Sequence, residues 1–408
     1  MHRIGIKVFL STLVLFFLAV QAQDEPINLT FSNFWTDPES GSGLLVQNRL
    51  AAFKEQYPNV TVDLQTLSHD EYLTKFRVLA SGDELPDVFI MNADQTTPLS
   101  QGGQLLEITG DLNADTAWRD LQNPGGMVEW TRDGAVYGMP AQMIITHTIY
   151  WNKDVFGEIG LSEFPATWED LKAAIVSLKE AGYTPIALGS KAGWPLFDSL
   201  FGTLAFRSIG VEWYNQLLAH EVEFTDPEFV SALNAFKELV DIGAFNADAT
   251  SLDNAQARAL YYNKEAAMFI EGNWAISEGI AAEAPEDVQG ATGLAIWPAL
   301  PGGNGAANEV TWAAGWGWGL SSKLEGEKRE AAVALVKALS DEEYGRERTE
   351  MGQAAAQMIS DYDASALPPL LVEHNAMEHL ARGAYFGSIR CHQSLRATLR
   401  HDRRRTRN

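Results

Sequence analysis

The order of strand-like and helix-like segments in the first hundred residues constrains the fold more than any other feature of this chain. Apolar periodicity predicts strands at 27–31, 60–64 and 86–91, with helices at 44–57 and around 72–79 between them. Parallel strands need a crossover connection, which is usually a helix packed on a face of the sheet. The sequence therefore predicts an α/β protein built on a doubly wound parallel sheet.

A second segment of this kind lies at 259–279. It predicts a helix end, a buried strand at 266–270, a turn at 271–273 and a new helix. Trp274 directly follows the turn, at the edge of the sheet where ligands bind in open α/β folds. Its ring is either a platform for a ligand or a core residue beneath a loop, and position alone does not decide between them.

The first 22 residues predict a signal peptide. Arg3 and Lys7 precede an apolar run at 8–20 that is short for a membrane span, and Ala22 offers a cleavage site. We therefore expect an exported protein in the periplasm or outside the cell, without a lipoprotein cysteine after the apolar run. Cys391 is the single cysteine, so no intramolecular disulfide is expected.

The net charge of −24 argues against nucleic acid or an anionic membrane as the main partner. Residues 388–408 differ from the rest, because they hold seven Arg and one Asp. This basic tail is either a nucleic-acid arm or a segment foreign to the remainder of the chain, and the overall charge favours the second interpretation. We expect no nucleic-acid partner, no cofactor and no metal, and we expect a monomer.

Three motifs carry a resemblance to a known family. Y-N-K-E-A-A-M-F-I-E-G-N-W-A at 262–275 is similar to G-x-A-A-M-x-x-x-G-x-W, with Lys264 at the usual Gly. Y-G-M-P at 137–140 followed by Y-W-N-K at 150–153 resembles Y-G-x-P followed by Y-Y-N-K, and G-W-G-W-G-L-S-S at 315–322 resembles G-x-x-W-x-I-S-x-x-S, the strand that returns to the first lobe. These motifs resemble those of family 1 extracellular solute-binding proteins of ABC importers, in the carbohydrate-binding group that includes the maltose-binding proteins. The resemblance covers about 27–371.

The resemblance implies a two-lobed, periplasmic-binding-protein-like fold in which each lobe is a doubly wound sheet flanked by helices. Lobe one would hold 23–139 and 298–350, and lobe two 140–297 and 351–387. Such receptors close over a mono- or oligosaccharide by hinge motion and deliver it to the permease of an ABC importer, without chemistry.

In the first lobe the resemblance places Trp35, Asp37, Glu39 and Asp94 near the sugar. A ring offers its face to sugar C–H groups, and a carboxylate accepts hydrogen bonds from hydroxyls. The alternative for each acid is a helix N-cap or a solvated loop, and it is strongest for Asp37, which precedes Pro38 in a turn-like sequence.

Further aromatic candidates lie in the second lobe and on the returning strand. Tyr150 and Trp151 are neighbours on a strand, so only one of them is expected to face the cleft. Trp194 lies in a Gly-flanked loop after a strand, and Trp316 lies nearer a loop than Trp318 on the same strand face. The candidate set is completed by Trp274.

Two predictions concern structural residues. Thr167 and Asp170 predict a helix N-cap, which makes Trp168 a core residue rather than a ligand platform. In the following helix, after Asp226 and Pro227, we expect four apolar residues to face the core: Val230, Leu233, Phe236 and Val240.

A secreted carbohydrate-active enzyme is the alternative function. Asp94 and Glu271 could form an acid/base pair about 5–10 Å apart, as glycosidases require. No local motif fixes such a pair, and neither a Ser/His/Asp arrangement nor metal-like His spacing is present among the eight His. The sequence therefore favours a binding protein that is not an enzyme.

Overall fold

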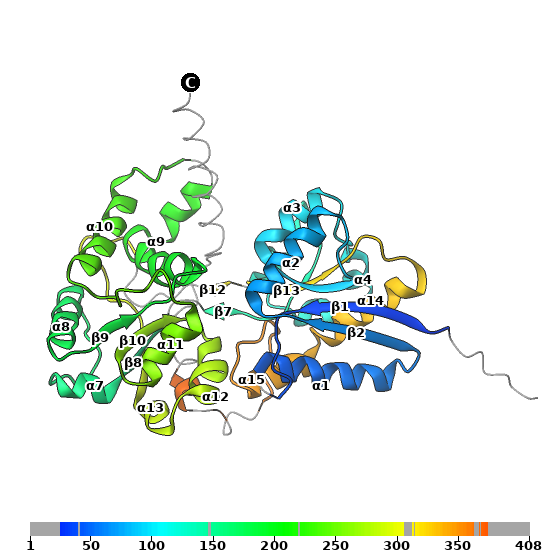
Figure 1. Cartoon of the computed structure of the whole chain (residues 1–408). Helices are drawn as coiled ribbons and strands as arrows, with labels where there is room; N and C mark the ends of the chain where they lie inside the picture. The colour runs from blue at the N-terminus through cyan, green and yellow to red at the C-terminus, as the bar shows by residue number, and fades with distance from the viewer. Residues whose placement is uncertain are drawn as a thin grey trace, which may run out of the picture.

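The computed structural model describes residues 25–39, 41–145, 148–218, 221–305, 312–313, 315–362, 367 and 369–373. These residues form two α/β lobes that are joined by narrow connections (Figure 1). The predicted signal peptide at 1–22 and the basic tail at 388–408 lie outside the described residues.

A five-stranded mixed sheet forms the centre of the first lobe, in the order β2-β1-β3-β13-β6. Its strands are β1 (Ile27–Asn33), β2 (Val60–Thr66), β3 (Val88–Asn92), β6 (Met139–Pro140) and β13 (Trp316–Leu320). The first three run parallel, as the sequence predicts, while β13 runs antiparallel to both β3 and β6. β13 therefore belongs to this sheet although it lies far from the other four strands along the chain.

Helices cover both faces of this sheet, and the two predicted from apolar spacing are present within a few residues of their expected bounds. The helices of the lobe are α1 (Gly41–Gln56), α2 (His69–Ser81), η1 (Ala93–Gln95), α3 (Thr96–Gln101), α4 (Thr109–Ala114), α5 (Thr116–Leu121), α6 (Pro124–Val128), α14 (Gly326–Ala338) and α15 (Glu342–Glu350). A small hairpin of β4 (Thr131–Arg132) and β5 (Ala135–Val136) lies beside them.

The second lobe has a four-stranded sheet in the order β11-β8-β10-β9. Its strands are β8 (Thr148–Asn152), β9 (Thr184–Ala187), β10 (Ala266–Glu271) and β11 (Thr292–Ala295). The predicted strand after residue 265 is therefore confirmed, and it lies in the interior of the sheet. β9 and β10 run parallel, whereas β8 runs antiparallel to both of its neighbours.

Nine helical segments surround the second sheet within the described residues. They are α7 (Lys153–Glu158), α8 (Trp168–Glu180), η2 (Pro195–Phe201), α9 (Gly202–Leu218), α10 (Pro227–Asp241), α11 (Asn254–Tyr262), η3 (Ala275–Ile280), α12 (Ala281–Glu283) and α13 (Glu286–Ala291). The expected cap of α8 is confirmed, because Thr167 accepts a hydrogen bond from the Asp170 amide, and Trp168 is buried.

The face that α10 turns toward the core differs from the prediction for three of the four residues, whereas Phe236 is partly buried against the core as expected. Val230, Leu233 and Val240 are 38%, 44% and 50% exposed, and the buried face is formed instead by Phe229, Ala232, Ala235 and Leu239. Both sets have helical spacing, so the pattern alone does not choose between them. The face with the small alanines lies inward, where short side chains allow close helix packing.

The connections between the lobes also run differently from the predicted boundaries. A short ribbon of β7 (Ile144–Ile145) and β12 (Trp312–Ala313) joins the lobes. Leu300 still packs in the second lobe's core, so that lobe extends beyond the predicted limit at residue 297. Ala354 and Ala356 pack with the first lobe, and Leu367 packs with the second, so the third crossing begins later than residue 351.

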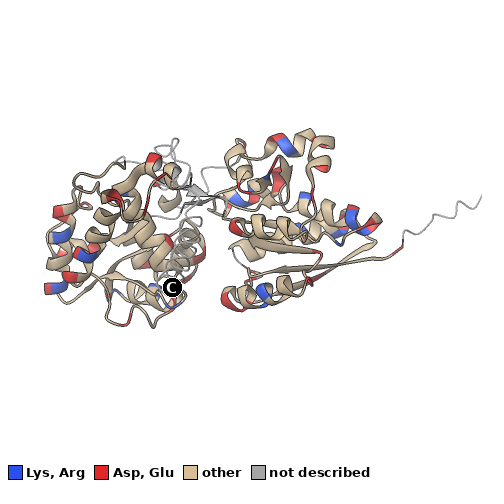
Figure 2. Ribbon diagram, turned by 90° about the horizontal axis from the view of Figure 1, so that it is seen from above, with Lys and Arg blue, Asp and Glu red and all other residues tan. Residues whose placement is uncertain are grey.

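Acidic side chains are spread over both lobes and alternate with Lys and Arg on the outer helices (Figure 2). Among the described residues, no helix is long and apolar enough to cross a membrane.

Candidate ligand-binding site

A cluster of aromatic rings lies at the carboxyl end of β1 in the first lobe. Phe34 and Trp35 follow the strand, and the Phe34 ring lies 4.6 Å from the ring of Trp316 on β13. His69, the first residue of α2, contacts the same Trp316 ring at 5.6 Å between centroids. Trp35 and Trp316 are both partly buried, so each ring keeps some surface for a ligand.

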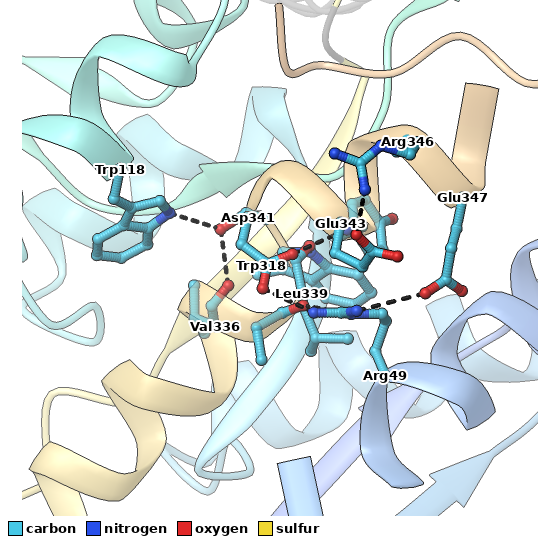
Figure 3. A network of polar contacts seen from close by, with 12 residues as sticks. Arg49, Trp118, Trp318, Val336, Leu339, Asp341, Glu343, Arg346 and Glu347 are labelled. Carbon is cyan, nitrogen blue, oxygen red and sulfur yellow. Dashed lines mark hydrogen bonds and ion pairs between the residues drawn. The ribbon is translucent and has the colours of Figure 1, made fainter. Parts of the chain in front are cut away.

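Trp318 supports this cluster from below. Its ring is fully buried, lies 5.4 Å from Trp35 and donates its indole N–H to the Leu339 carbonyl at 2.8 Å. Arg49 fixes the same corner between α14 and α15, where its guanidinium pairs with Asp341 at 2.7 Å (Figure 3). Trp318 is thus a core residue, and of the two tryptophans on β13 only Trp316 has an exposed part.

Arg348 of α15 adds a buried cation to the first-lobe cluster. Its guanidinium carbon lies 5.6 Å from the centroid of the Trp35 ring, within the range of a cation–π contact. The same group donates to Ser42 Oγ at 3.3 Å and to Gln142 Oε1. Arg348 is 2% exposed, so these contacts compensate for the loss of its hydration. One face of Trp35 is therefore already covered by the protein.

The predicted first-lobe acids lie in different surroundings. Asp37 and Glu39 are exposed, and Asp37 Oδ1 accepts the Glu39 amide at 2.9 Å, which is the local turn that the alternative interpretation describes. A Cβ at Gly43 would lie 1.8 Å from the Asp37 carbonyl oxygen, so this turn packs directly on the start of α1. Asp94 is partly buried in η1 and follows β3.

Trp194 and Trp274 form the aromatic wall of the second lobe. Their ring centroids are 6.0 Å apart in an edge-to-face arrangement, and both side chains are partly buried. Each tryptophan is the residue just before a π-helical turn that follows a strand of the sheet: Trp194 precedes η2, and Trp274 precedes η3. The structure thus brings together two tryptophans that are 80 residues apart in the sequence.

The Trp274 ring lies flat against the backbone of the turn that precedes it. A Cβ at Gly272 would lie 1.9 Å from the ring carbon Cζ3, so only glycine leaves room for the indole there. The indole N–H donates to Glu271 Oε1 at 2.6 Å. Gly272 therefore defines the position of the Trp274 ring, and Glu271 defines its rotation.

Glu271 is buried beneath this wall, with 1% of its side chain exposed. Its Oε1 accepts a second hydrogen bond from Asn254 Nδ2 at 2.6 Å and lies 3.6 Å from Arg258 Nη1. Burial raises the pKa of the Glu271 carboxyl, while the Arg258 charge and the two hydrogen bonds act in the opposite direction.

Tyr150 and Trp151 do not face a cleft, contrary to the expectation that one of them would. Their side chains are 0% and 5% exposed, and they pack on opposite faces of β8 against Phe269 and Phe156. All five residues of β8 are buried, so both faces of this strand are covered. The Tyr150 hydroxyl donates to the Gly272 carbonyl at 2.8 Å and so supports the turn beneath Trp274.

Direct contacts join the lobes beside both aromatic groups. Glu278 of η3 accepts hydrogen bonds across the junction from Ser42 Oγ and Gln353 Nε2, each at 2.8 Å. Asn273 Nδ2 also donates to the Met143 carbonyl at 3.3 Å. Since Ser42 contacts the arginine that covers Trp35, the two aromatic groups flank the same lobe junction.

Sequence reasoning missed several residues of this site. The sequence around Phe34 and His69 gives only a weak indication of a site. Phe34 follows a predicted strand, and His69 lies at the start of a predicted helix. Arg348 and Gln353 carry none, because their partners lie far away along the chain. Among the described residues, no group of His, Cys, Asp and Glu could hold a metal ion.

Comparison with known proteins identifies the family. The family model described as bacterial extracellular solute-binding protein matches residues 38–346, which is most of the chain. This chain therefore belongs to the bacterial extracellular solute-binding protein family. That assignment confirms the family predicted from the three sequence motifs.

Curated relatives match this chain at low sequence identity and over only part of their length. An ABC transporter extracellular-binding protein of Pyrococcus horikoshii is 28% identical over 228 residues, which cover 55% of this chain and 51% of that protein. The mannitol-binding protein of Pseudomonas aeruginosa is 29% identical over 248 residues, or 59% of this chain and 53% of the relative. The chain thus spans about half the length of these relatives.

The fold is shared with solved binding proteins. A chitin oligosaccharide binding protein superposes with a TM-score of 0.79 at 22% identity, and the match covers 88% of both chains. The predicted two-lobed α/β architecture is therefore confirmed.

Proposed function

We propose that this chain is an extracytoplasmic sugar-binding receptor that closes over a mono- or oligosaccharide and delivers it to the permease of an ABC importer. The observation that carries the proposal is the pair of aromatic groups, Trp35 with Trp316 in one lobe and Trp194 with Trp274 in the other, on either side of one lobe junction. Partly exposed indole faces suit the C–H faces of a pyranose ring. Among similar proteins, one is named for chitin oligosaccharides and another for the sugar alcohol mannitol, which supports a polyhydroxylated carbohydrate ligand.

The site has polar groups as well as rings. Asp94 follows β3 in the first lobe, and the exposed Asp37 and Glu39 lie in the loop after Trp35. Sugar hydroxyls that meet a carboxylate give charge-assisted hydrogen bonds, which supply orientation and specificity beyond stacking. We propose Asp94 as a direct ligand contact, and Asp37 and Glu39 as contacts that form when the lobes approach each other.

The burial of Glu271 argues against the alternative enzyme. A general acid must reach the glycosidic oxygen, but Glu271 is 1% exposed and its Oε1 already accepts from Trp274 and Asn254. Asp94, its proposed partner, lies in the other lobe. In this conformation Asp94 and Glu271 therefore do not form the pair of accessible carboxylates that a glycosidase requires.

A sugar panel tests the function. The chain without residues 1–22 is screened by thermal shift against mono-, di- and oligosaccharides, since a ligand that binds only the folded state raises the melting temperature. Each hit is then titrated by calorimetry and incubated with the protein overnight, followed by chromatography of the sugar. Saturable binding with unchanged sugar supports a receptor. Released product supports the enzyme, and a panel without any hit contradicts a sugar ligand.

Partner and location are part of the same proposal. We propose that the receptor acts as a monomer in the periplasm or at the outer cell surface and contacts a transmembrane permease. Membership of an extracellular solute-binding family supports export. Light scattering after size exclusion tests the monomer, and cell fractionation with an antibody against the chain tests the location.

A further inference from the structure

We propose that Glu271 is a positioning residue of the sugar site, whose carboxylate fixes the plane of the Trp274 indole in the orientation that meets the ligand. The inference rests on the proposed sugar-binding function, because it concerns how one wall of that site is built. It differs from the first interpretation of Glu271 as a possible catalytic acid, because here the residue acts through another side chain.

Three contacts hold the Trp274 ring. The indole lies on the backbone of Gly272, where a Cβ would come within 1.9 Å of the ring. Its N–H donates to Glu271 Oε1 at 2.6 Å, and its side meets the Trp194 ring at 6.0 Å between centroids. A tryptophan has two side-chain torsions, so a floor beneath the ring and a hydrogen bond at the pyrrole nitrogen together leave one orientation.

The carboxylate is itself held from several elements. Asn254 at the start of α11 donates to the same Oε1 at 2.6 Å, and Arg258 of α11 lies 3.6 Å away. Beneath the turn, the Tyr150 hydroxyl of β8 donates to the Gly272 carbonyl at 2.8 Å. The turn and its carboxylate are therefore fixed by the scaffold of the second lobe, independently of any ligand.

Glu271 cannot reach a ligand directly in this conformation, because 1% of its side chain is exposed whereas Trp274 is partly exposed. Burying an ionised carboxylate is unfavourable unless its partners compensate. An apolar residue would fill the same space but would offer no acceptor for the indole N–H and would leave the ring less restrained. Fixing the ring before binding removes an ordering cost from the binding step, and this gain in affinity is the role that we assign to Glu271.

A double-mutant cycle tests the proposal. Glu271→Met keeps the length of the side chain and removes the acceptor, and Trp274→Phe keeps a ring and removes the donor. We expect Glu271→Met to weaken sugar binding by roughly tenfold in the natural background and by less than about twofold beside Trp274→Phe. Glu271→Gln retains a carbonyl oxygen at the same place, so we expect it to bind within about threefold of the natural protein.

Glu238→Met is the matched control. Glu238 accepts the indole N–H of Trp168 at 3.0 Å in the same lobe, but Trp168 is buried and belongs to a different core cluster from Trp274. We expect the control to lower the melting temperature and leave the sugar dissociation constant unchanged. Glu271→Asp keeps the charge and withdraws the oxygen by one methylene, and it replaces Glu271→Met in the cycle if that variant does not fold.

The outcomes separate this inference from the proposed function. Near-ultraviolet circular dichroism reports the Trp274 environment without a ligand, and we expect Glu271→Met to reduce the part of the spectrum that Trp274→Phe removes. An equal loss of affinity in both Trp274 backgrounds would mean that Glu271 acts on the fold or the ligand directly, which overturns the inference. Absence of sugar binding by the natural protein would overturn the function, while the spectra would still test the ring.

Discussion

Removal of the Trp274 ring is the most direct perturbation of the proposed site. Trp274→Ala deletes the indole that lies on Gly272 and pairs with Trp194, and it leaves the strand before it unchanged. The ring is partly exposed and packed on one side, so we expect the variant to fold. The effect should therefore fall on the affinity for sugar.

The expected magnitude follows from the area that a ligand would cover. A tryptophan side chain buries about 150–250 Å² when it is fully enclosed, and a sugar stacked on the exposed part would cover roughly 80 Å² of ring. At about 25 cal/mol per Å² this burial is worth about 2 kcal/mol. A loss of that size raises the dissociation constant by roughly 30-fold.

Isothermal titration with the best sugar of the panel measures this change. The heat-capacity change of binding should also become less negative, because less apolar surface is buried in the complex. Trp168→Ala is the control: that ring is 3% exposed, so its loss should cost about 3–5 kcal/mol of stability and leave the affinity of the folded protein unchanged. An unaltered dissociation constant for Trp274→Ala would refute the stacking role.

Three further predictions concern the lobe junction, pH and closure. Glu278→Ala removes the acceptor of three cross-junction bonds, so spin-label distances between the lobes should broaden; an unchanged distribution would show that these contacts do not restrain the lobes. The pKa of Glu271 is raised above its ordinary value of 4.5 by burial, with Arg258, Glu278 and Tyr150 facing it from α11, η3 and β8. The proton on the Glu271 carboxyl therefore stabilises the folded state below about pH 4.5, and this stabilisation is lost as the pH rises through the raised pKa. The unfolding free energy of the natural protein minus that of Glu271→Gln should fall over this window in urea titrations, and a constant difference would contradict the shift. Saturating sugar should reduce the radius of gyration in small-angle scattering, and Asp94→Ala should weaken both binding and this reduction; an unchanged radius would place the site within one lobe.

Much of the fold was predictable because its signals are local. Alternation, helix spacing and stop residues such as Pro58 gave β1, α1 and β2 nearly to their bounds. The inward face of α10 was not predictable, because two apolar stripes have the same period and only tertiary packing decides between them. The lobe boundaries near 298 and 351 were also placed too early, because nothing local marks where a crossing chain leaves one core for the other.

The sequence predicted where the aromatic residues of the site lie better than it predicted which residues they contact. A tryptophan near the end of a strand is visible in the sequence: Trp35, Trp194 and Trp274 follow strands and Trp316 begins one, and all four are partly exposed. Tyr150 was placed wrongly, because a short apolar strand does not reveal that helices cover both of its faces. The polar partners depend on long-range contacts: Arg348 meets Trp35 after β1, Ser42 of α1 and Gln142 after β6, all of which lie far from it along the chain.

The segment from Glu271 to Glu278 joins the aromatic wall to the lobe junction. Trp274, which we propose as a ligand platform, precedes η3, and Glu278 lies one turn further along the same short helix. Any movement of η3 therefore displaces both Trp274 and the Glu278 carboxylate that bonds Ser42 and Gln353. Because a packed helical turn moves as a unit, we expect lobe motion that changes the Glu278 contacts to carry Trp274 with it, so that a sugar bound on this ring would bias the lobe equilibrium.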